Sequence, residues 1–328
     1  MRAPSALVAV SSGLALAIAA LSAAACGTTN ASATTAVRQV TFYTGPPGGA
    51  YSPLGKALAE VYNKTIPQAH VTVFSNDGPR GAGINAEAIE TGKADLGFSR
   101  SDIAYDAFRS GTEGDEKPNT HLRAMAVLYT NAVHVIVRRA SGIQNWHDVV
   151  GKRVQLTEEA GAPLARVVLE GHGVALRDVQ IVPGARNAIT RLKNGEMDVR
   201  IFASAYPLAT IDDVSETSEL KLMSIDPAAV DRLRSNYPFF KPAVIPANTY
   251  HGQTDDIRTV GIDGLLLCHD SMPEALVYEM TRRLFEALPE LSRAQPAARL
   301  INVGRAPSTP VPLHPGAARY YRERDLFR

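Results

Sequence analysis

Short runs of β-branched and aromatic residues alternate along this chain with longer stretches in which apolar residues recur every three or four positions. The short runs predict β-strands, and the longer stretches predict amphipathic helices. Strands are expected at residues 40–43, 71–74, 96–98, 123–129, 133–137, 153–156, 179–182, 199–202 and 265–268. Because helical stretches separate most of these strands, the pattern predicts an α/β fold.

The turns between these segments carry residues that begin and end helices. The first helix is expected to have Ser52 as its N-cap and Pro53 at its first helical position. Gly92 and Gly111 are expected to end the next two helices, and Asn145 to cap a short one. Further helices are expected at residues 163–170, 185–194, 273–288 and 316–328, the last of them on the surface.

Two parts of the chain repeat the same local arrangement. Gly92-Lys93-Ala94-Asp95 joins a helix to a strand, and Gly195-Glu196-Met197-Asp198 does so again about a hundred residues later. The repetition suggests two similarly built domains, the usual division for a chain of this length. We expect a discontinuous domain I, at residues 38–127 plus 246–328, with domain II, residues 128–245, inserted in it.

The N-terminal segment has the character of an export signal. Arg2 precedes an apolar run at residues 7–21, and small residues lead to Cys26. Residues 1–25 are therefore expected to be a signal peptide and residues 26–37 a flexible tether. The small residues before Cys26 resemble a lipobox, although its leucine lies two places too far away, so lipidation of Cys26 and ordinary cleavage before it are both open.

Composition places the chain among globular proteins. Of its 328 residues, 45% are hydrophobic and 20% charged, and the formal net charge of +1 gives no electrostatic basis for binding nucleic acid. Partners are expected to be small molecules or proteins. Cys268 follows three leucines and is expected to be a buried apolar residue; with Cys26 acylated, no disulfide can form.

Glycine- and serine-rich turns follow several of the predicted strands. Ligands of α/β proteins bind at the carboxyl ends of strands, where helix N-termini offer free N–H groups to anions. Four such turns are candidates for one ligand cleft: residues 43–51, 77–83, 99–102 and 157–162. Each turn alone has a purely structural explanation.

Other chemistries lack their motifs. The Gly45–Gly49 turn has neither the Lys-Ser/Thr of a phosphate-binding loop nor a dinucleotide fingerprint. There is no G-x-S-x-G nucleophile turn, and the histidines, including His172 and the pair His269-Asp270, show no metal-binding spacing and are interpreted as structural. We expect no enzyme activity, no cofactor and no metal.

Several segments resemble one family in order along the chain. The run from Tyr43 to Gly55, the segments 92–98 and 101–105, Leu128-Tyr129, and the stretch 246–253 are similar to the TAXI family, the TRAP-associated extracytoplasmic solute-binding proteins. The resemblance covers nearly the whole chain after the signal segment. It implies a two-domain periplasmic-binding-protein fold of the second topological type, with the ligand between the domains.

The resemblance also implies a function. Such a protein closes its domains on a small carboxylate or amino acid, glutamate-like or an oxo-acid, and delivers it to TRAP membrane subunits outside the cytoplasmic membrane. A monomer, lipid-anchored at Cys26, is expected. The expected ligand-binding residues are Tyr43, Gly45, Gly48, Gly49, Tyr51, Arg100, Ser101, Tyr129, Thr157, Glu159, Gly161 and Tyr206.

Two positions depart from the family pattern. Arg100 stands where glutamine is common, and it either clamps a ligand carboxylate or lies solvated at a helix start. Residues 157–162 read Thr-Glu-Glu-Ala-Gly-Ala instead of a Gly-Ser-Gly-Thr loop. If Arg100 and Glu158 or Glu159 both face the cleft, a zwitterion such as an amino acid satisfies both. A receptor that serves a signalling partner is the alternative function.

Overall fold

The computed structural model describes residues 36–47, 49–76, 81–111, 117–156, 164–184, 187–208, 211, 219–237 and 239–326. The strands in this part of the chain are β1 (Arg38–Thr44), β2 (Ala69–Ser75), β3 (Leu96–Arg100), β4 (Leu122–Arg138), β5 (Arg153–Leu156), β6 (Gln180–Val182), β7 (Val199–Ser204), β8 (Leu220–Leu222), β9 (Lys241–Ile245) and β10 (Ile257–His269). The α-helices are α1 (Tyr51–Thr65), α2 (Ala82–Glu90), α3 (Ser101–Ser110), α4 (Leu164–Gly171), α5 (Ala188–Lys193), α7 (Pro227–Asn236), α8 (Glu274–Glu286), α9 (Leu288–Ala294) and α10 (Pro315–Arg322).

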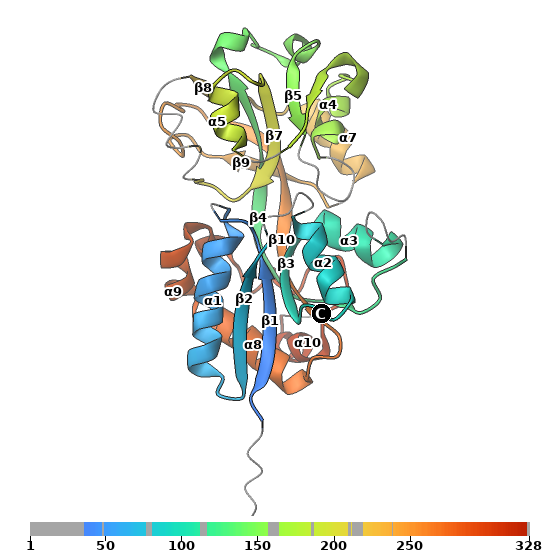
Figure 1. Ribbon diagram of the computed structural model, residues 1–328, viewed down its shortest axis with the longest axis vertical. Helices are drawn as coiled ribbons and strands as arrows, with labels where there is room; N and C mark the ends of the chain where they lie inside the picture. The colour runs from blue at the N-terminus through green and yellow to red at the C-terminus, as the bar shows by residue number, and fades with distance from the viewer. Residues whose placement is uncertain are drawn as a thin grey trace, which may run out of the picture. The chain divides into compact units, whose positions relative to one another are not determined.

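The described strands form one sheet in the order β2-β1-β3-β10-β4-β7-β5-β6, and β8 and β9 pair with β4 and β10. The first three strands are parallel to one another, whereas β10 runs antiparallel to both β3 and β4. The two longest strands, β4 and β10, are shared: they run through both halves of the sheet (Figure 1). At one end β10 pairs with β3, and at the other end β10 pairs with β9 and β4 pairs with β7. They therefore connect two half-sheets: the first contains β1, β2 and β3, and the second contains β5, β6, β7, β8 and β9.

The continuity of β4 differs from the sequence prediction of two strands. Thr130 and Asn131 read as a polar interruption, yet both continue the ladder, opposite Asp263 and Ile262 of β10. Their side chains are satisfied by tertiary contacts, because the Thr130 hydroxyl donates to Asp263 at 2.9 Å. From the sequence alone this polar pair predicts a turn, because its hydrogen-bond and ladder partners lie on β10, far away along the chain.

Apolar side chains gather on each side of the two half-sheets. Beside β1 and β3 the core contains Phe42, Leu58 and Phe98, all fully buried, with Cys268 among them as expected. Beside β5 and β7 it is built from Val154, Ile201 and other residues of a separate cluster. The division into domains I and II remains a proposal, and these cores are its physical basis.

Helix boundaries follow the turn chemistry with two corrections. The short 3₁₀ helix Trp146–Val149 is capped as expected, since Asn145 Oδ1 accepts a hydrogen bond from the N–H of His147 at 2.9 Å. Helix α1, however, begins at Tyr51 and has Ala50 at its N-cap without a side-chain bond, so Ser52 is not the cap.

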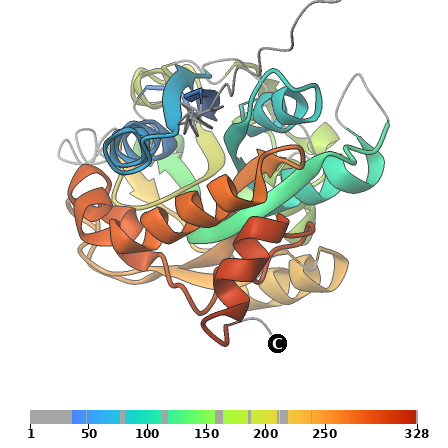
Figure 2. The same ribbon diagram turned by 90° about the horizontal axis from the view of Figure 1, so that it is seen from below.

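The C-terminal helix is the second correction, because α10 is a core element rather than a surface helix. Tyr320 and Tyr321 are 3% and 0% exposed, and the Tyr321 hydroxyl donates to the Met125 carbonyl at 2.8 Å. Figure 2 shows α10, in red, alongside α8, in orange. Gly316 and Ala317 are buried on α10, and small residues let two helices approach closely. No helix within the described ranges is long and apolar enough to cross a bilayer.

Candidate functional site

The carboxyl ends of β1, β2 and β3 lie at one edge of the sheet because these strands are parallel. Asn85 of α2 ties these ends together and is 1% exposed. Its amide nitrogen donates to the carbonyls of Thr44 and Phe98 at 3.2 and 2.8 Å, and its oxygen accepts from Asn76 at 3.0 Å. The edge from which α1 and α3 begin is thus held by buried hydrogen bonds.

Tyr51 occupies the centre of this edge. Its hydroxyl donates to the Ser99 carbonyl at 3.1 Å and accepts a hydrogen bond from Asn131 Nδ2 at 3.2 Å. Its ring stacks on Phe98, with centroids 5.0 Å apart, and lies 6.2 Å from the ring of Tyr129. Tyr51 therefore connects the start of α1 to β3 and to the shared strand β4.

Gly264 of β10 makes this arrangement possible. It pairs with Arg100 across the ladder, and a Cβ atom at this position would lie 2.7 Å from the Tyr51 hydroxyl and 3.2 Å from Asn131 Nδ2. Only glycine leaves room for the tyrosine hydroxyl to approach the strand. Gly264 was not among the residues expected from the sequence, where a glycine beside an apolar strand run was the available signal.

Arg100 is buried and ion-paired. Its Nε and Nη2 atoms donate to the two carboxylate oxygens of Asp102 at 3.0 and 2.6 Å, and both side chains are less than 10% exposed. The solvated alternative for Arg100 is therefore wrong. The bidentate contact expected for a ligand carboxylate is made by Asp102, which leaves the pair with no net charge.

Two buried hydroxyl groups near this pair lack partners. Ser101, the first residue of α3, is 4% exposed and Tyr129 is 1% exposed. Neither hydroxyl has a hydrogen-bond partner among the described residues. Burial raises the pKa of the Tyr129 hydroxyl well above its ordinary value, and nearby Tyr51 adds to this. An unsatisfied buried hydroxyl costs about 1–3 kcal/mol, so each of these groups is a candidate to bind a ligand.

The end of β1 and the turn that follows it contain three of the expected residues: Tyr43 in the strand, and Gly45 and Gly49 in the turn. Tyr43 is half-buried and stacks on Phe74, with ring centroids 5.7 Å apart. The Gly45 carbonyl accepts a hydrogen bond from the Ser75 hydroxyl at 3.0 Å, and the N–H of Gly49 donates to the Pro46 carbonyl at 3.0 Å. These contacts fix the turn beside Tyr51.

The remaining expected residues fall in two groups. Gly48, Thr157, Glu158, Glu159, Gly161 and the lipidation candidate Cys26 lie outside the described residues. Tyr206 packs at the margin of the apolar cluster that contains Phe202 and Tyr250 in the second half-sheet. It does not belong to the group around Tyr51.

Lys241 of β9 and the nearby Phe239 meet this edge at two places. Asp263 of β10 is 3% exposed and pairs with Lys241 of β9 and with Arg305, the latter at 3.3 Å. Asp106 of α3 borders a small cavity whose other walls include Phe239. Burial raises the pKa of the Asp106 carboxyl, and the neighbouring Asp102 raises it further.

A larger cavity of about 270 Å³ lies elsewhere, against β8 and residues 250–257. Of the expected ligand-binding residues that fall within the described ranges, none lines it. Its wall includes Ile211 and Leu220, which flank residues 212–218 outside the described part of the chain. The hydrogen-bonded edge around Tyr51, rather than this cavity, contains the candidate site.

Comparison with protein families matches residues 42–324 to a family described as NMT1-like. The chain belongs to the NMT1-like family. Among solved structures, this NMT1-like protein is similar to the periplasmic binding protein BugD, with a TM-score of 0.53 and 15% identity over 88% of this chain and 94% of that one. It is also similar to a structure described as a periplasmic transporter, with a TM-score of 0.50 and 13% identity over 88% and 93% of the two chains.

A third similarity is to the alkanesulfonate-binding protein SsuA from Xanthomonas axonopodis pv. citri, bound to MOPS, with a TM-score of 0.45 and 15% identity over 82% and 85% of the chains. The two similarities with higher TM-scores show that the NMT1-like chain has the α/β fold of periplasmic binding proteins. The sequence prediction of that fold is confirmed. The strand order β2-β1-β3-β10-β4 agrees with its second topological type.

Proposed function

We propose that this protein is the solute-binding component of a TAXI-type TRAP transport system outside the cytoplasmic membrane. It binds a small carboxylate or amino acid, glutamate-like or an oxo-acid, by domain closure and presents it to TRAP membrane subunits. It works as a monomer, anchored through lipid on Cys26, and it is not an enzyme. The fold and the family match support a solute-binding role, and the resemblance in sequence supports the TAXI assignment.

The observation that carries the proposal is the unpartnered hydroxyl of Ser101 at the start of α3. The N-terminus of a helix attracts anions through free N–H groups and a partial positive charge. A carboxylate placed there accepts from Ser101 and from the backbone, while Tyr129 offers a second buried hydroxyl. Because Asp102 already neutralises Arg100, these neutral donors are proposed as the main anion contacts.

Asp106 supports an amino acid over a plain carboxylate. Its carboxyl lies one turn along α3 from Asp102, and burial raises its pKa because the charged form loses water. An ammonium group beside Asp106 would stabilise the charged carboxylate. Ser101 and Asp106 are five positions apart on α3, about 140° around the helix, so a glutamate-like amino acid would place its side-chain carboxylate at Ser101 and its amine at Asp106, in place of the role first expected for Glu158 or Glu159.

We propose that the two half-sheets move toward each other about the strands that connect them, β4 and β10. β4 and β10 carry the chain between the half-sheets, and Asp263 and α3 face residues of the 237–241 segment. A ligand that contacts both sides stabilises the closed form relative to the open one, and a membrane subunit that recognises the closed form then receives only loaded protein.

The first experiment is a thermal-shift screen with amino acids, oxo-acids, dicarboxylates and polyamines, because a ligand that binds only the folded state raises the melting temperature. Isothermal titration of any hit then compares wild type with Ser101→Ala. Loss of a hydrogen bond to a charged group is expected to weaken binding about tenfold to a hundredfold. Ser292→Ala, on helix α9, is the matched control and should bind as wild type does.

Two further outcomes test the finer claims. Asp106→Asn should weaken an amino acid but leave an oxo-acid of the same skeleton unaffected. A thermal shift with polyamines alone, or equal affinity in Ser101→Ala and wild type, would contradict anion capture at α3. For the anchor, Cys26→Ser should move the protein from the membrane fraction to the soluble extracytoplasmic fraction; unchanged fractionation would contradict lipidation at this residue.

A further inference from the structure

Three side chains with metal-binding atoms meet at the far end of the shared strands. His121 immediately precedes β4, His269 is the last residue of β10, and Asp270 follows it. In the ladder His269 pairs with Leu122, so the register of two central strands brings these residues together across almost 150 positions of sequence. The N–H of Asp270 also donates to the His121 carbonyl at 2.9 Å, which fixes the backbone of the group.

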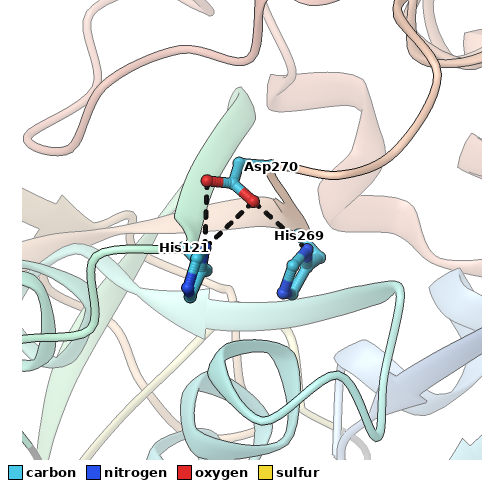
Figure 3. A group of neighbouring side chains, drawn as sticks. All are labelled: His121, His269 and Asp270. Carbon is cyan, nitrogen blue, oxygen red and sulfur yellow. Dashed lines mark hydrogen bonds and ion pairs between the residues drawn. The ribbon is translucent and has the colours of Figure 1, made fainter.

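The side chains of these residues face one another (Figure 3). The two imidazole rings are stacked, with centroids 5.1 Å apart and planes inclined by 10°. One carboxylate oxygen, Asp270 Oδ1, lies 3.2 Å from His121 Nδ1 and 3.3 Å from His269 Nδ1. One possible ligand atom from each residue lies within 4.8 Å of the other two.

We propose that His121, His269 and Asp270 form a binding site for a divalent transition-metal ion of the Zn²⁺ class. Zinc bonds of about 2.0–2.1 Å in a tetrahedron separate neighbouring ligand atoms by about 3.3 Å, close to the two nitrogen–oxygen distances here. Imidazole nitrogens with one carboxylate are a preferred ligand set for such ions, and water completes the fourth position. The side chain of His121 is 53% exposed, which leaves the site an entry path.

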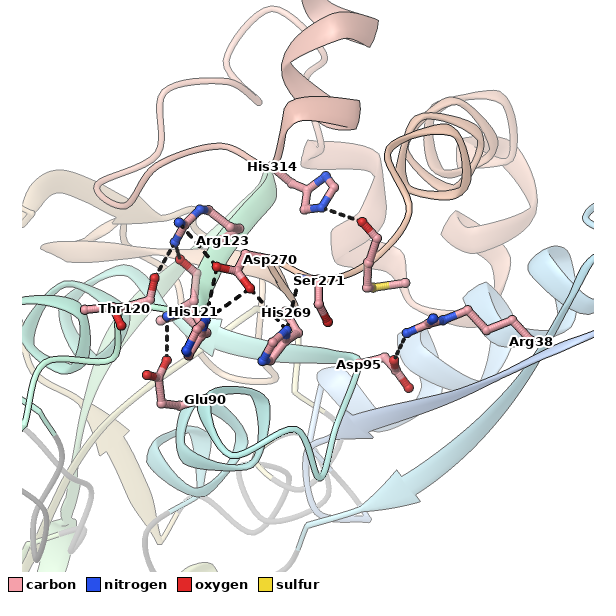
Figure 4. A network of polar contacts seen from close by, with 12 residues as sticks. Arg38, Glu90, Asp95, Thr120, His121, Arg123, His269, Asp270, Ser271 and His314 are labelled. Atoms are coloured by element: carbon pink, nitrogen blue, oxygen red, sulfur yellow. Dashed lines mark hydrogen bonds and ion pairs between the residues drawn. The ribbon is translucent and has the colours of Figure 1, made fainter.

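The surroundings show what an ion must displace. Figure 4 places His121 and Asp270 in a wider polar network with Arg123 and Ser271. The N–H of Ser271 donates to His269 Nδ1 at 3.1 Å, and Arg123 Nη2 lies 3.5 Å from Asp270 Oδ2. Binding therefore replaces the Ser271 contact and the proton between His121 and Asp270, and it brings the ion near the Arg123 guanidinium. It also requires the stacked rings to rotate, because the Nδ1 lone pairs lie in the ring planes, which are nearly parallel here.

The site is separate from the proposed solute site. Leu122 and Tyr129 are seven residues apart on β4, which corresponds to about 23 Å at the rise of a strand. The metal site thus joins the ends of β4 and β10 within the first half-sheet. Metal binding is therefore expected to raise the free energy of unfolding and to leave solute affinity unchanged.

Isothermal titration of the untagged protein with Zn²⁺ alone tests the proposal, with Co²⁺ absorption as a probe of tetrahedral coordination. One ion per chain is expected. His121→Ala, an exposed position, and the isosteric Asp270→Asn should each weaken binding about tenfold or more, as loss of a ligand or of its supporting contact does. His70→Ala, an exposed histidine on β2, is the matched control and should leave affinity unchanged.

Arg123→Gln gives a prediction of the opposite sign. Removal of a positive charge beside Asp270 should tighten zinc binding severalfold, which ordinary surface histidines would not show. The proposal is overturned if wild type binds no zinc in excess metal, or if His121→Ala and Asp270→Asn bind as wild type does. A cluster held by hydrogen bonds alone would give either of these results.

Discussion

A buried histidine on β4 should make the protein sensitive to mild acid. His134 is 0% exposed, and its ring stacks on Phe202 with centroids 5.2 Å apart. Its Nδ1 lies 2.9 Å from the Ala132 carbonyl and its Nε2 lies 2.8 Å from the Tyr250 hydroxyl. A neutral ring satisfies both contacts, since Nδ1–H donates to the carbonyl and Nε2 accepts from the tyrosine.

The magnitude follows from the pKa. Burial lowers the pKa of His134 from 6.5 to about 4, and the positive charge of Arg200 also lowers it, against the effect of the Ala132 contact. Because the unfolded chain takes up the proton first, stability is full above about pH 6.5 and falls as the pH drops toward about 4. Between about pH 7 and pH 5 the linkage relation gives a loss of about 2 kcal/mol from this residue.

The assay is urea unfolding of wild type and His134→Gln across this range. Groups common to both chains contribute equally, so the difference in unfolding free energy isolates His134. Wild type should lose about 2 kcal/mol more than the variant between about pH 7 and pH 5. His147→Gln, an exposed control, should follow wild type. Parallel curves for wild type and His134→Gln would refute the assignment of a neutral, buried histidine.

Three further substitutions test other contacts by the same unfolding assay. Asp198→Asn should lower the free energy of unfolding by about 1–2 kcal/mol at neutral pH. This buried carboxylate, whose pKa is lowered to about 2, loses charged contacts such as the one with Arg153 Nη2 at 2.9 Å. If the loss persisted at a pH below this pKa, the cause would not be ionic. Gly316→Ala should cost about 1–3 kcal/mol, since the new Cβ would collide with the α8 backbone, and an unchanged midpoint would contradict the close helix packing. Tyr321→Phe should cost about 1 kcal/mol by leaving the Met125 carbonyl without its partner, and no loss would contradict a buried α10.

The sequence predicted the elements that local periodicity determines. Helix α1, with its inward residues Leu54 and Leu58 fully buried, and the glycine that ends α3 follow from side-chain spacing and from backbone freedom at Gly111, whose φ is +90°. The lengths of the strands were harder to predict from the sequence. The pairing of Asn131 with Ile262 extends β4 through a polar stretch, and such pairing depends on residues far apart in sequence.

The candidate site was predicted in part for the same reason. Tyr51, Ser101 and Tyr129 were expected from the resemblance, and the structure places Tyr51 against the ring of Tyr129. The direction of the Arg100 side chain was not predictable, because a strand-to-helix junction decides whether it reaches Asp102 or a ligand. The meeting of His121 with His269 required the β4–β10 register, which no local spacing reveals.

The positions where prediction from local sequence failed lie at the proposed ligand-binding edge and at the strands that join it to the second half-sheet. A continuous apolar strand would have been simplest at residues 130–131 and 263–264, but the chain has a polar pair, Thr130 and Asn131, opposite Asp263 and Ile262, and a glycine, Gly264, directly after the aspartate. Those residues hold Tyr51 through Asn131 and bind Lys241 through Asp263, so they join the ligand edge to the inserted segment. Sequences that depart from local consistency tend to do so where function requires it. On this argument, we propose that the paired strands β4 and β10 bend or shift when the protein closes on its solute, and substitutions at residues 130–131 and 263–264 should alter solute affinity more than stability.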